Sequence, residues 1–266
     1  MMAESIQELD DREEVRLERK SLSKSTSVKY LKLNRYTNIL CYDDSLPTTV
    51  EYINASVIEF KEFNCNTTNA KRFIATQAPP VRTFGTFYSL ILEEGVRDIV
   101  QVSNYQENGR PKVDYYLPDD KELQFGDITV KTLSVEDDAE CLTTHLEIST
   151  NSKAIQTRHI LYKNWPDHSA PTSLRSLIGL LGRLDESAPC VVHCSAGVGR
   201  SATLIALHEM LRCKNQPLLP FYDDLKGRSY ENSDIVYRTV DFIRRQRPLS
   251  CEAKQIAWLY QAVNRL

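Results

Sequence analysis

The sequence predicts one α/β domain in which a mixed β-sheet is flanked by helices. The chain has 266 residues, of which 41% are hydrophobic, and this composition is sufficient for one large core. Several strand-like runs come early and most helical segments come later, an order typical of a sheet with helices packed on it. In between, the stretch PCVVHCSAGVGRSATLIAL at 189–207 passes from an apolar strand to a helix through a tight turn.

The N-terminal segment is predicted to be a helical extension. Residues 4–20 have helical composition with interleaved charges, and Ile6, Leu9 and Leu17 are its expected anchors. The polar stretch SLSKSTS that follows is typical of a hinge. The expected division is an extension with its hinge at 1–27 and one domain at 28–266.

The remaining elements follow from the spacing of apolar residues. Strands are predicted at 50–58, 71–77, 98–103, 128–135, 144–150 and 156–165. A further buried strand is expected to end at Val191 and Val192. Helices are predicted at about 84–95, 173–186, 201–213, 233–246 and 252–266.

Charge and cysteine content narrow the class of protein. The net charge of −3 does not indicate a general nucleic-acid binder. The apolar runs are too short for a membrane span, and the acidic start MMAESIQELDD is unlike a signal peptide. Seven cysteines, scattered from Cys41 to Cys251 without a CxxC pair, predict neither a disulfide framework nor a zinc ribbon. A reducing, cytoplasmic location is therefore expected.

The turn at 194–200 has the composition of an anion-binding loop with a nucleophile at its base. Gly197 and Gly199 allow the backbone to bend so that successive N–H groups face inward. The following helix places its positive end at the same point, and Arg200 supplies a planar fork for two phosphate oxygens. The same field would stabilise the thiolate of Cys194, which makes this cysteine a candidate nucleophile near neutral pH.

The alternative is that Cys194 is a buried, inert thiol, because a cysteine six residues before an arginine is weak evidence by itself. A nucleophilic role is favoured by the preceding His193, the two glycines, the hydroxyl of Ser201 and the strand–turn–helix context. Together they resemble the signature loop HCSAGxGR[ST] of the cysteine-dependent protein tyrosine phosphatases. The resemblance covers roughly residues 30–266, through EYINASVI, FIATQAP and IVQVSN, and indicates a classical, tyrosine-specific, non-receptor-like catalytic domain.

The resemblance implies a highly twisted sheet with the site at the C-terminal end of the strand that ends in His193. It implies hydrolysis of phosphotyrosine in proteins through a phosphocysteine on Cys194, with the phosphate held by Arg200 and the loop. Ser201 is included among the catalytic residues. Neither a metal nor an organic cofactor is implied. The loop residues expected to bind substrate are Ser195, Ala196, Gly197, Val198 and Gly199.

A general acid is needed to protonate the leaving tyrosyl oxygen. Asp167 lies in NWPDHSAP, about thirty residues before the cysteine, and an aspartate after a proline is usually a turn residue. The triplet of Trp165, Pro166 and Asp167 resembles the mobile acid loop of the family. On this resemblance, Asp167 is the acid of the first step and the base of the second.

Substrate selection is expected from the stretch KLNRYTNILCYDDS. It resembles the loop of the family in which a tyrosine, here Tyr36, stacks on the substrate ring and makes the pocket deep. Asn38 is at the position that contacts the peptide backbone. Glu107 and Lys112 match a family Glu and Lys that reach toward the cysteine and acid loops, although charged residues are more often solvated.

The sequence departs from the family at two glutamines, QTxxQ, that position the attacking water. Gln255 matches the second glutamine. The first falls on Cys251 or Glu252 across an apparent deletion, which leaves the rate of the second step open.

Three alternatives to a tyrosine phosphatase are disfavoured by the sequence. A phosphotyrosine-binding pseudophosphatase would keep the loop but turn over poorly, and the presence of Cys194, Asp167 and Arg200 favours the enzyme. A dual-specificity phosphatase is disfavoured by the chain length and by the stretch around Tyr36. A metal site at His193 and Cys194 is disfavoured because no partner pair has metal-ligand spacing.

Overall fold

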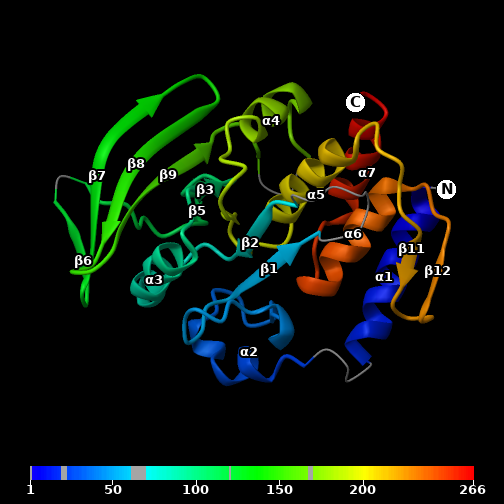
Figure 1. Cartoon of the computed structure of the whole chain (residues 1–266), viewed down its shortest axis with the longest axis horizontal. Helices are drawn as coiled ribbons and strands as arrows, with labels where there is room; N and C mark the ends of the chain where they lie inside the picture. The colour runs from blue at the N-terminus through cyan, green and yellow to red at the C-terminus, as the bar shows by residue number, and fades with distance from the viewer. Residues whose placement is uncertain (1, 19–22, 61–69, 120, 167–169) are drawn as a thin grey trace.

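The structure is a computed structural model that describes residues 2–18, 23–60, 70–119, 121–166 and 170–266. A central sheet carries helices on both of its faces (Figure 1). In the described residues the α-helices are α1 (Met2–Glu18), α2 (Ser25–Lys29), α3 (Phe84–Glu94), α4 (Leu174–Leu181), α5 (Arg200–Cys213), α6 (Ile235–Gln246) and α7 (Ala253–Val263).

The main sheet, within the described part of the chain, has eight strands in the order β1-β2-β10-β3-β9-β8-β7-β6. Their bounds are β1 (Ala55–Glu59), β2 (Arg72–Thr76), β3 (Asp98–Gln101), β6 (Leu123–Phe125), β7 (Ile128–Asp137), β8 (Cys141–Ser149), β9 (Ala154–Tyr162) and β10 (Cys190–His193). The pairs of β2 with β10, β10 with β3, and β3 with β9 are parallel, and the others are antiparallel. The predicted mixed sheet is confirmed.

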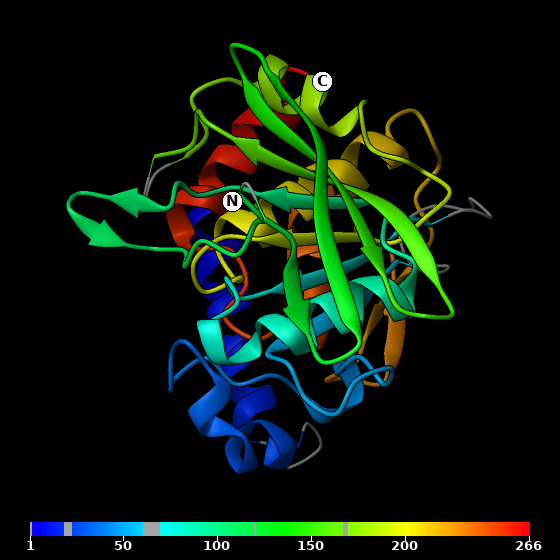
Figure 2. The ribbon, with the colours of Figure 1, turned by 90° about the vertical axis from the view of Figure 1, so that its left-hand side faces the viewer.

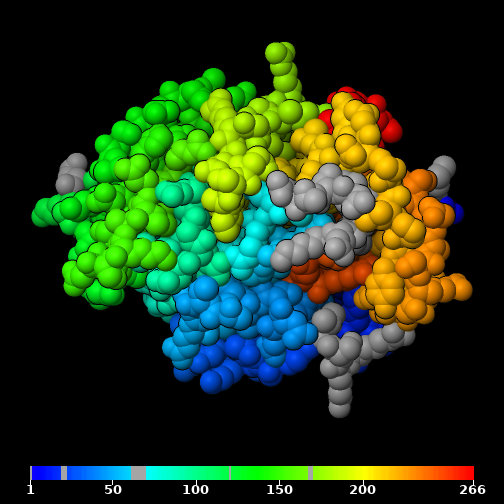
Figure 3. Space-filling model, in the orientation of Figure 1, coloured from blue at the N-terminus to red at the C-terminus, as the bar shows by residue number. Residues whose placement is uncertain are grey.

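Two short hairpins stand apart from this sheet. They are β4 (Gln106–Glu107) with β5 (Arg110–Pro111), and β11 (Phe221–Asp223) with β12 (Arg228–Tyr230). Figure 2 shows the β4–β5 hairpin extending from the body of the protein. In the space-filling view the green strands β7 to β9 form one side of the face, and the blue N-terminal part of the chain forms its base (Figure 3).

Strand β10 occupies the centre of the sheet because its short apolar run is buried on both sides. All four of its residues are fully buried, and its last residue, His193, pairs with Thr76 of β2 and Gln101 of β3. Near-continuous apolar runs of this kind are typical of parallel strands covered on both faces. The chain therefore leaves the middle of the sheet at His193 and enters the loop that begins with Cys194.

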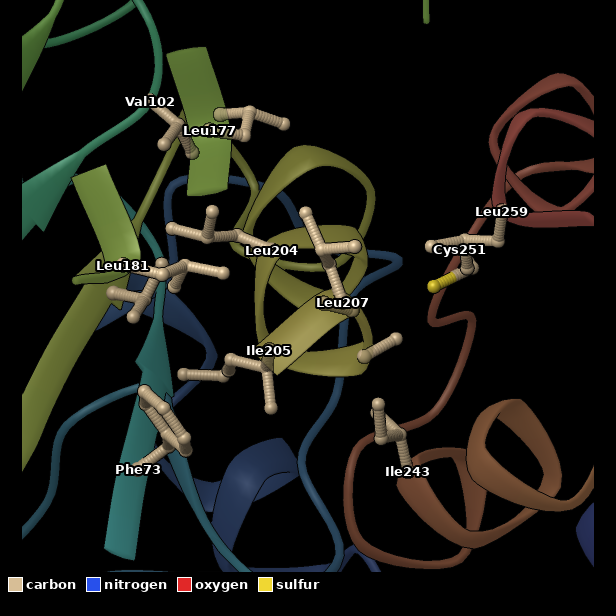
Figure 4. Packing of buried hydrophobic residues seen from close by; sticks show 14 of the residues in the cluster. Phe73, Val102, Leu177, Leu181, Leu204, Ile205, Leu207, Ile243, Cys251 and Leu259 are labelled. Atoms are coloured by element: carbon tan, nitrogen blue, oxygen red, sulfur yellow. The ribbon is translucent and has the colours of Figure 1, made fainter. Parts of the chain in front are cut away.

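Two hydrophobic cores cover the two faces of the sheet. One contains α3 with residues such as Ile99 and Val191, and the other contains α4 to α7 with residues such as Phe73 and Val192. Figure 4 shows Leu204, Ile205 and Leu207 of α5 within the second core. Helix α5 is thus packed on nearly all sides, which fixes the position of its N-terminus beside the cysteine loop.

Several predicted boundaries were wrong for local reasons. The strand expected at 50–58 begins only at Ala55, because the chain turns at Asn54, whose amide donates to Ile39 O at 2.7 Å. The helix expected at 173–186 ends at Leu181, with Gly182 as its C-cap. The two hairpins were missed because strands of two or three residues carry no readable periodicity.

Helix α1 confirms the helix predicted near the N-terminus and packs on α6 and α7 (Figure 1). Of its expected anchors, Leu9 is fully buried and Ile6 packs on the core, but Leu17 is 45% exposed, so that anchor was wrong. Arg12 and Arg16 turn instead toward the body, where both form ion pairs with carboxylates of 223–241.

Part of the predicted hinge falls outside the described residues, at 21 and 22, and residues 25–27 form the first turn of α2. The division of the chain at residue 27 stays a prediction. The buried contacts of α1 favour a helix that is an integral part of the folded unit.

Replacing Leu9 with Ala tests this integration. Loss of a fully buried leucine should lower the free energy of unfolding of the whole protein by about 2–5 kcal/mol in a single transition. Leu17→Ala, at an exposed position on the same helix, should change it by less than about 0.5 kcal/mol. Urea unfolding followed by fluorescence measures both variants. Equal, small effects would show that α1 is an independent extension.

Candidate active site

A pocket of about 430 Å³ opens where β10 meets α5. Its floor is the cysteine loop, Cys194 to Gly199, and its walls come from three other segments of the chain. The residues lining it are Tyr36, Arg110, Pro111, Lys112, Cys194, Ser195, Ala196, Val198, Gly199, Arg200, Glu252 and Gln255. Most of the predicted site residues therefore meet in one place, although they are up to about 220 positions apart in sequence.

Gly197 is required by the close approach of the loop to strand β2. Its φ of +73° is a conformation that side chains disfavour, and an added Cβ would lie 2.0 Å from Thr76 O. Its N–H donates to the Cys194 sulfur at 3.2 Å. Gly199 has an ordinary φ of −82°, but an added Cβ would lie 3.0 Å from Gln255 Nε2.

The thiol of Cys194 is 4% exposed, and burial alone would raise its pKa. The positive charge of Arg200 acts in the opposite direction, together with the hydroxyl and N–H of Ser201 and the N–H of Gly197. These contacts prevail, so that the pKa of Cys194 lies below the ordinary value of a thiol. In Cys141 and Cys251 burial prevails instead and raises the pKa of each thiol to about 11.

Arg200 is held in place by a buried carboxylate. Its Nη1 and Nη2 donate to the two oxygens of Glu107 at 2.6 and 3.0 Å, and both residues are less than 9% exposed. The paired bonds fix the plane of the guanidinium. The expectation that Glu107 reaches toward the cysteine loop is met by this contact.

The same guanidinium marks one end of the expected acid loop. Arg200 Nη1 also donates to Trp165 O at 3.1 Å, and the Trp165 side chain is 1% exposed. Asp167 itself lies outside the described residues, so its position relative to Cys194 stays a prediction.

One wall of the pocket joins the segment of Tyr36 to Lys112, which directly follows the β4–β5 hairpin. The Tyr36 hydroxyl bonds to Ser195 Oγ at 2.7 Å, and Ser195 Oγ donates to Lys112 O at 2.9 Å. Ser195 thus links both segments to the cysteine loop. Asn38 is exposed and does not line the pocket, because the chain turns away after Tyr36. Its contact with the peptide backbone stays a prediction.

The two candidates for the missing glutamine have different surroundings. Glu252 lines the pocket beside Gln255, whose Oε1 accepts from Glu252 N at 2.9 Å. Cys251 is 1% exposed, and its sulfur points toward α5 (Figure 4), where Thr203 Oγ1 lies 3.8 Å away. Of the two positions, only 252 borders the pocket.

Comparison with known proteins assigns this arrangement to a family. A family model described as Protein-tyrosine phosphatase matches residues 30–265. The chain belongs to the protein-tyrosine phosphatase family. This confirms the resemblance of the cysteine loop and the predicted fold class.

Relatives of the phosphatase domain include receptor and non-receptor types. Putative receptor-type tyrosine-protein phosphatase mosPTP-1 of Culex quinquefasciatus is 35% identical over an alignment of 208 positions, which covers 69% of this chain and 14% of that protein. Tyrosine-protein phosphatase non-receptor type 9 of Rattus norvegicus is 31% identical over an alignment of 271 positions, which covers 90% of this chain and 42% of that protein. The chain thus spans less than half the length of either relative.

Solved structures share the fold. The catalytic domain of human protein tyrosine phosphatase non-receptor type 18 superposes with a TM-score of 0.82 at 21% identity, covering 99% of this chain and 95% of that chain. PTPN18 has also been solved in complex with HER2-pY1248 phosphopeptides.

One residue that supports the phosphatase loop was missed by sequence reasoning. Arg247 is fully buried and donates from Nε to Gly197 O at 2.6 Å and from Nη2 to Ala196 O at 3.1 Å. Its other partners among the described residues include Asn54 Oδ1 at 2.9 Å. It stands in the basic run RRQR, whose composition is typical of a solvated helix end, so no signal in the sequence separated it from its neighbours.

His193 of the phosphatase motif orients the backbone and is uncharged. Its Nδ1 lies 3.1 Å from Cys194 O, and its Nε2 lies 2.6 Å from the hydroxyl of Tyr116. Complete burial lowers the pKa of His193 to about 4, so the ring is neutral near pH 7. A base with so low a pKa holds a proton too weakly to take one from the thiol of Cys194.

Two features are absent from the described residues. No described helix is both long and apolar enough to cross a membrane. In the same part of the chain, no group of three or more His, Cys, Asp or Glu side chains is arranged to hold a metal ion.

Alkylation of Cys194 by iodoacetamide tests the cause of its low pKa. The rate should reach half its maximum below the ordinary pKa of a thiol, because Arg200 and Ser201 stabilise the thiolate. Ser201→Ala should raise this midpoint, because the hydroxyl is one of the groups that lower the pKa of Cys194. Thr203→Ser keeps its hydroxyl and should leave the midpoint unchanged, and Cys194→Ser gives the background of other thiols. An unshifted midpoint in Ser201→Ala would contradict the role of its hydroxyl.

Proposed function

We propose that the chain hydrolyses phosphotyrosine in proteins through a phosphocysteine. The observation that carries this proposal is a thiol of lowered pKa at the floor of a pocket that Arg200 also lines. In the first step the thiolate of Cys194 attacks phosphorus and the bond to the tyrosyl oxygen breaks, with Asp167 donating a proton to that oxygen. In the second step water attacks phosphorus, the S–P bond breaks, and Asp167 takes the proton.

The site must stabilise the negative charge of the phosphoryl group, and the cysteine loop supplies the groups that do so. The N–H groups of residues 195–199 and the N-terminus of α5 supply fixed dipoles, and Arg200 supplies a positive charge. Glu107 keeps the guanidinium in one plane before substrate arrives, so little reorganisation is needed. No cofactor enters either step.

The walls of the pocket favour an aromatic phosphate. Tyr36 lines it at a half-buried position and is fixed by its bond to Ser195, so its ring can flank a substrate ring. Phosphotyrosine is long enough to bring its phosphate to Cys194 along such a wall, whereas phosphoserine is not. The HER2 phosphopeptides in complex with PTPN18 are ligands of this chemical class. We propose phosphotyrosine proteins as partners, and a cytoplasmic location remains the sequence-based prediction.

Phosphate release from a phosphotyrosine peptide and from a matched phosphoserine peptide tests the activity. The wild type should hydrolyse the first and leave the second nearly untouched. Cys194→Ser should abolish turnover, because a serine hydroxyl is not ionised near neutral pH, yet it should still bind the phosphotyrosine peptide. Activity of Cys194→Ser within tenfold of wild type would overturn the phosphocysteine. Tight binding without turnover in the wild type would instead identify a pseudophosphatase.

Replacing Asp167 tests the general acid. Asp167→Ala should lower kcat by about two to four orders of magnitude with little change in KM. Asp114→Ala, which removes a carboxylate paired with Arg35 outside the pocket, is a control for the loss of charge. Steady-state kinetics on a phosphotyrosine peptide measures both. Full activity of Asp167→Ala would make Asp167 a turn residue and require another acid.

The missing glutamine predicts that the second step limits turnover. Rapid mixing with an aryl phosphate should give a burst of phenol near one equivalent, followed by a slow steady rate. Glu252→Gln should raise the steady rate without changing the burst, because position 252 borders the pocket and an amide can still cap α7. Cys251→Gln should not, since it forces a larger polar group into a buried site. No burst, and no gain from Glu252→Gln, would show that the water is already held.

A further inference from the structure

The segment 247–252, which joins α6 to α7, adopts a conformation that its own residues do not favour. Leu249 and Cys251 both have φ of +61°, in the left-handed region that non-glycine residues rarely occupy. Such residues persist only where surrounding contacts over-determine them. The segment also carries Glu252 and leads directly into Gln255, so its conformation sets the position of both pocket residues.

Two side chains hold this segment, Glu13 of the N-terminal helix α1 and Arg244 of α6. The carboxylate of Glu13, which is 5% exposed, accepts a hydrogen bond from Leu249 N and faces Arg244 Nε at 3.5 Å. Arg244 in turn donates to Ser250 O at 2.9 Å and to Cys251 O at 3.1 Å. One carboxylate of α1 and one guanidinium of α6 therefore satisfy the backbone of three consecutive residues.

The segment 247–252 then touches the cysteine loop directly. Cys251 N donates to Val198 O at 3.0 Å, and Arg247 donates to Gly197 O at 2.6 Å. A continuous series of contacts thus runs from α1 to the floor of the pocket. The nucleophile and the phosphate-binding guanidinium of the first step have other supports, because Arg200 is held by Glu107 and Cys194 follows directly from β10.

We propose that Glu13 is a positioning residue for the second step of the reaction. It keeps Leu249 in the left-handed conformation by accepting its N–H. Together with Asp10, whose carboxylate pairs with Arg244 Nη1 at 2.8 Å, it also orients Arg244 toward the carbonyl of Cys251, so that Gln255 is presented to the phosphocysteine and its attacking water. The inference rests on the two-step activity proposed above. It makes α1 part of the catalytic domain in function as well as in packing.

The test compares Glu13→Gln with Glu14→Gln, which changes the next residue on the exposed side of α1. In rapid mixing with an aryl phosphate, Glu13→Gln should lower the steady rate about tenfold and leave the burst rate within about twofold of wild type. If the wild type shows no burst, Glu13→Gln should create one. Glu14→Gln should behave as wild type. Both variants are assayed well below their unfolding midpoints.

Hydrogen exchange of the amides of 247–252 gives a reading that does not require activity. Exchange at Leu249 should be faster in Glu13→Gln than in the wild type and unchanged in Glu14→Gln. An unchanged steady rate in Glu13→Gln, or equal losses in the burst and steady rates, would overturn the proposal. If the wild type has no phosphatase activity at all, the proposed function fails, and unchanged exchange at Leu249 would then overturn the positioning role separately.

Discussion

The site depends on one backbone constraint, which is that the carbonyls of the cysteine loop must bond outward if its N–H groups are to remain available for an anion. Each carbonyl from residue 195 to residue 199 has a donor outside the pocket, and the donors come from three parts of the chain. They are Ala78 N, Arg247, Cys251 N, and the N–H and hydroxyl of Thr203. A buried carbonyl without a donor would be costly, so these donors fix the loop in one conformation.

Two buried arginines place positive charge beside the cysteine loop, one beneath it and one at the pocket. Arg247 brings a buried positive charge beneath the loop, where its described partners are carbonyls, an amide, a hydroxyl and a thiol. Arg200 brings a second one to the pocket but shares it with Glu107. The first charge contributes a constant field, whereas the second can exchange part of its bonding for phosphate oxygens. The charge of Arg200 is also the one that lowers the pKa of Cys194.

The part of the site that could be predicted from sequence is the part that is local in sequence. Residues 193–201 are consecutive, so one stretch of sequence was enough to predict the motif, the strand before it and the helix after it. The donors to the loop carbonyls could not be predicted, because Ala78 and Arg247 approach the loop only through the fold, and their neighbours have the same composition.

The choice between positions 251 and 252 required the left-handed φ of Cys251, which turns its side chain into the core. Leu17 was predicted to be an anchor because it is apolar. The prediction was wrong because this helix buries arginines at ion pairs and leaves the leucine in solvent.

The contrast among the buried cysteines has a consequence for oxidation. Peroxide reacts with thiolates, and the low pKa of Cys194 singles it out from neighbours such as Cys190, whose pKa is raised by complete burial in β10. The first product would be a sulfenic acid at the base of the pocket. Among the described residues that line the pocket, Cys194 is the only cysteine, so no resolving thiol stands beside it there. Recovery from such oxidation would therefore depend on a small thiol that can enter the phosphate site, and an occupied site would be protected from both events.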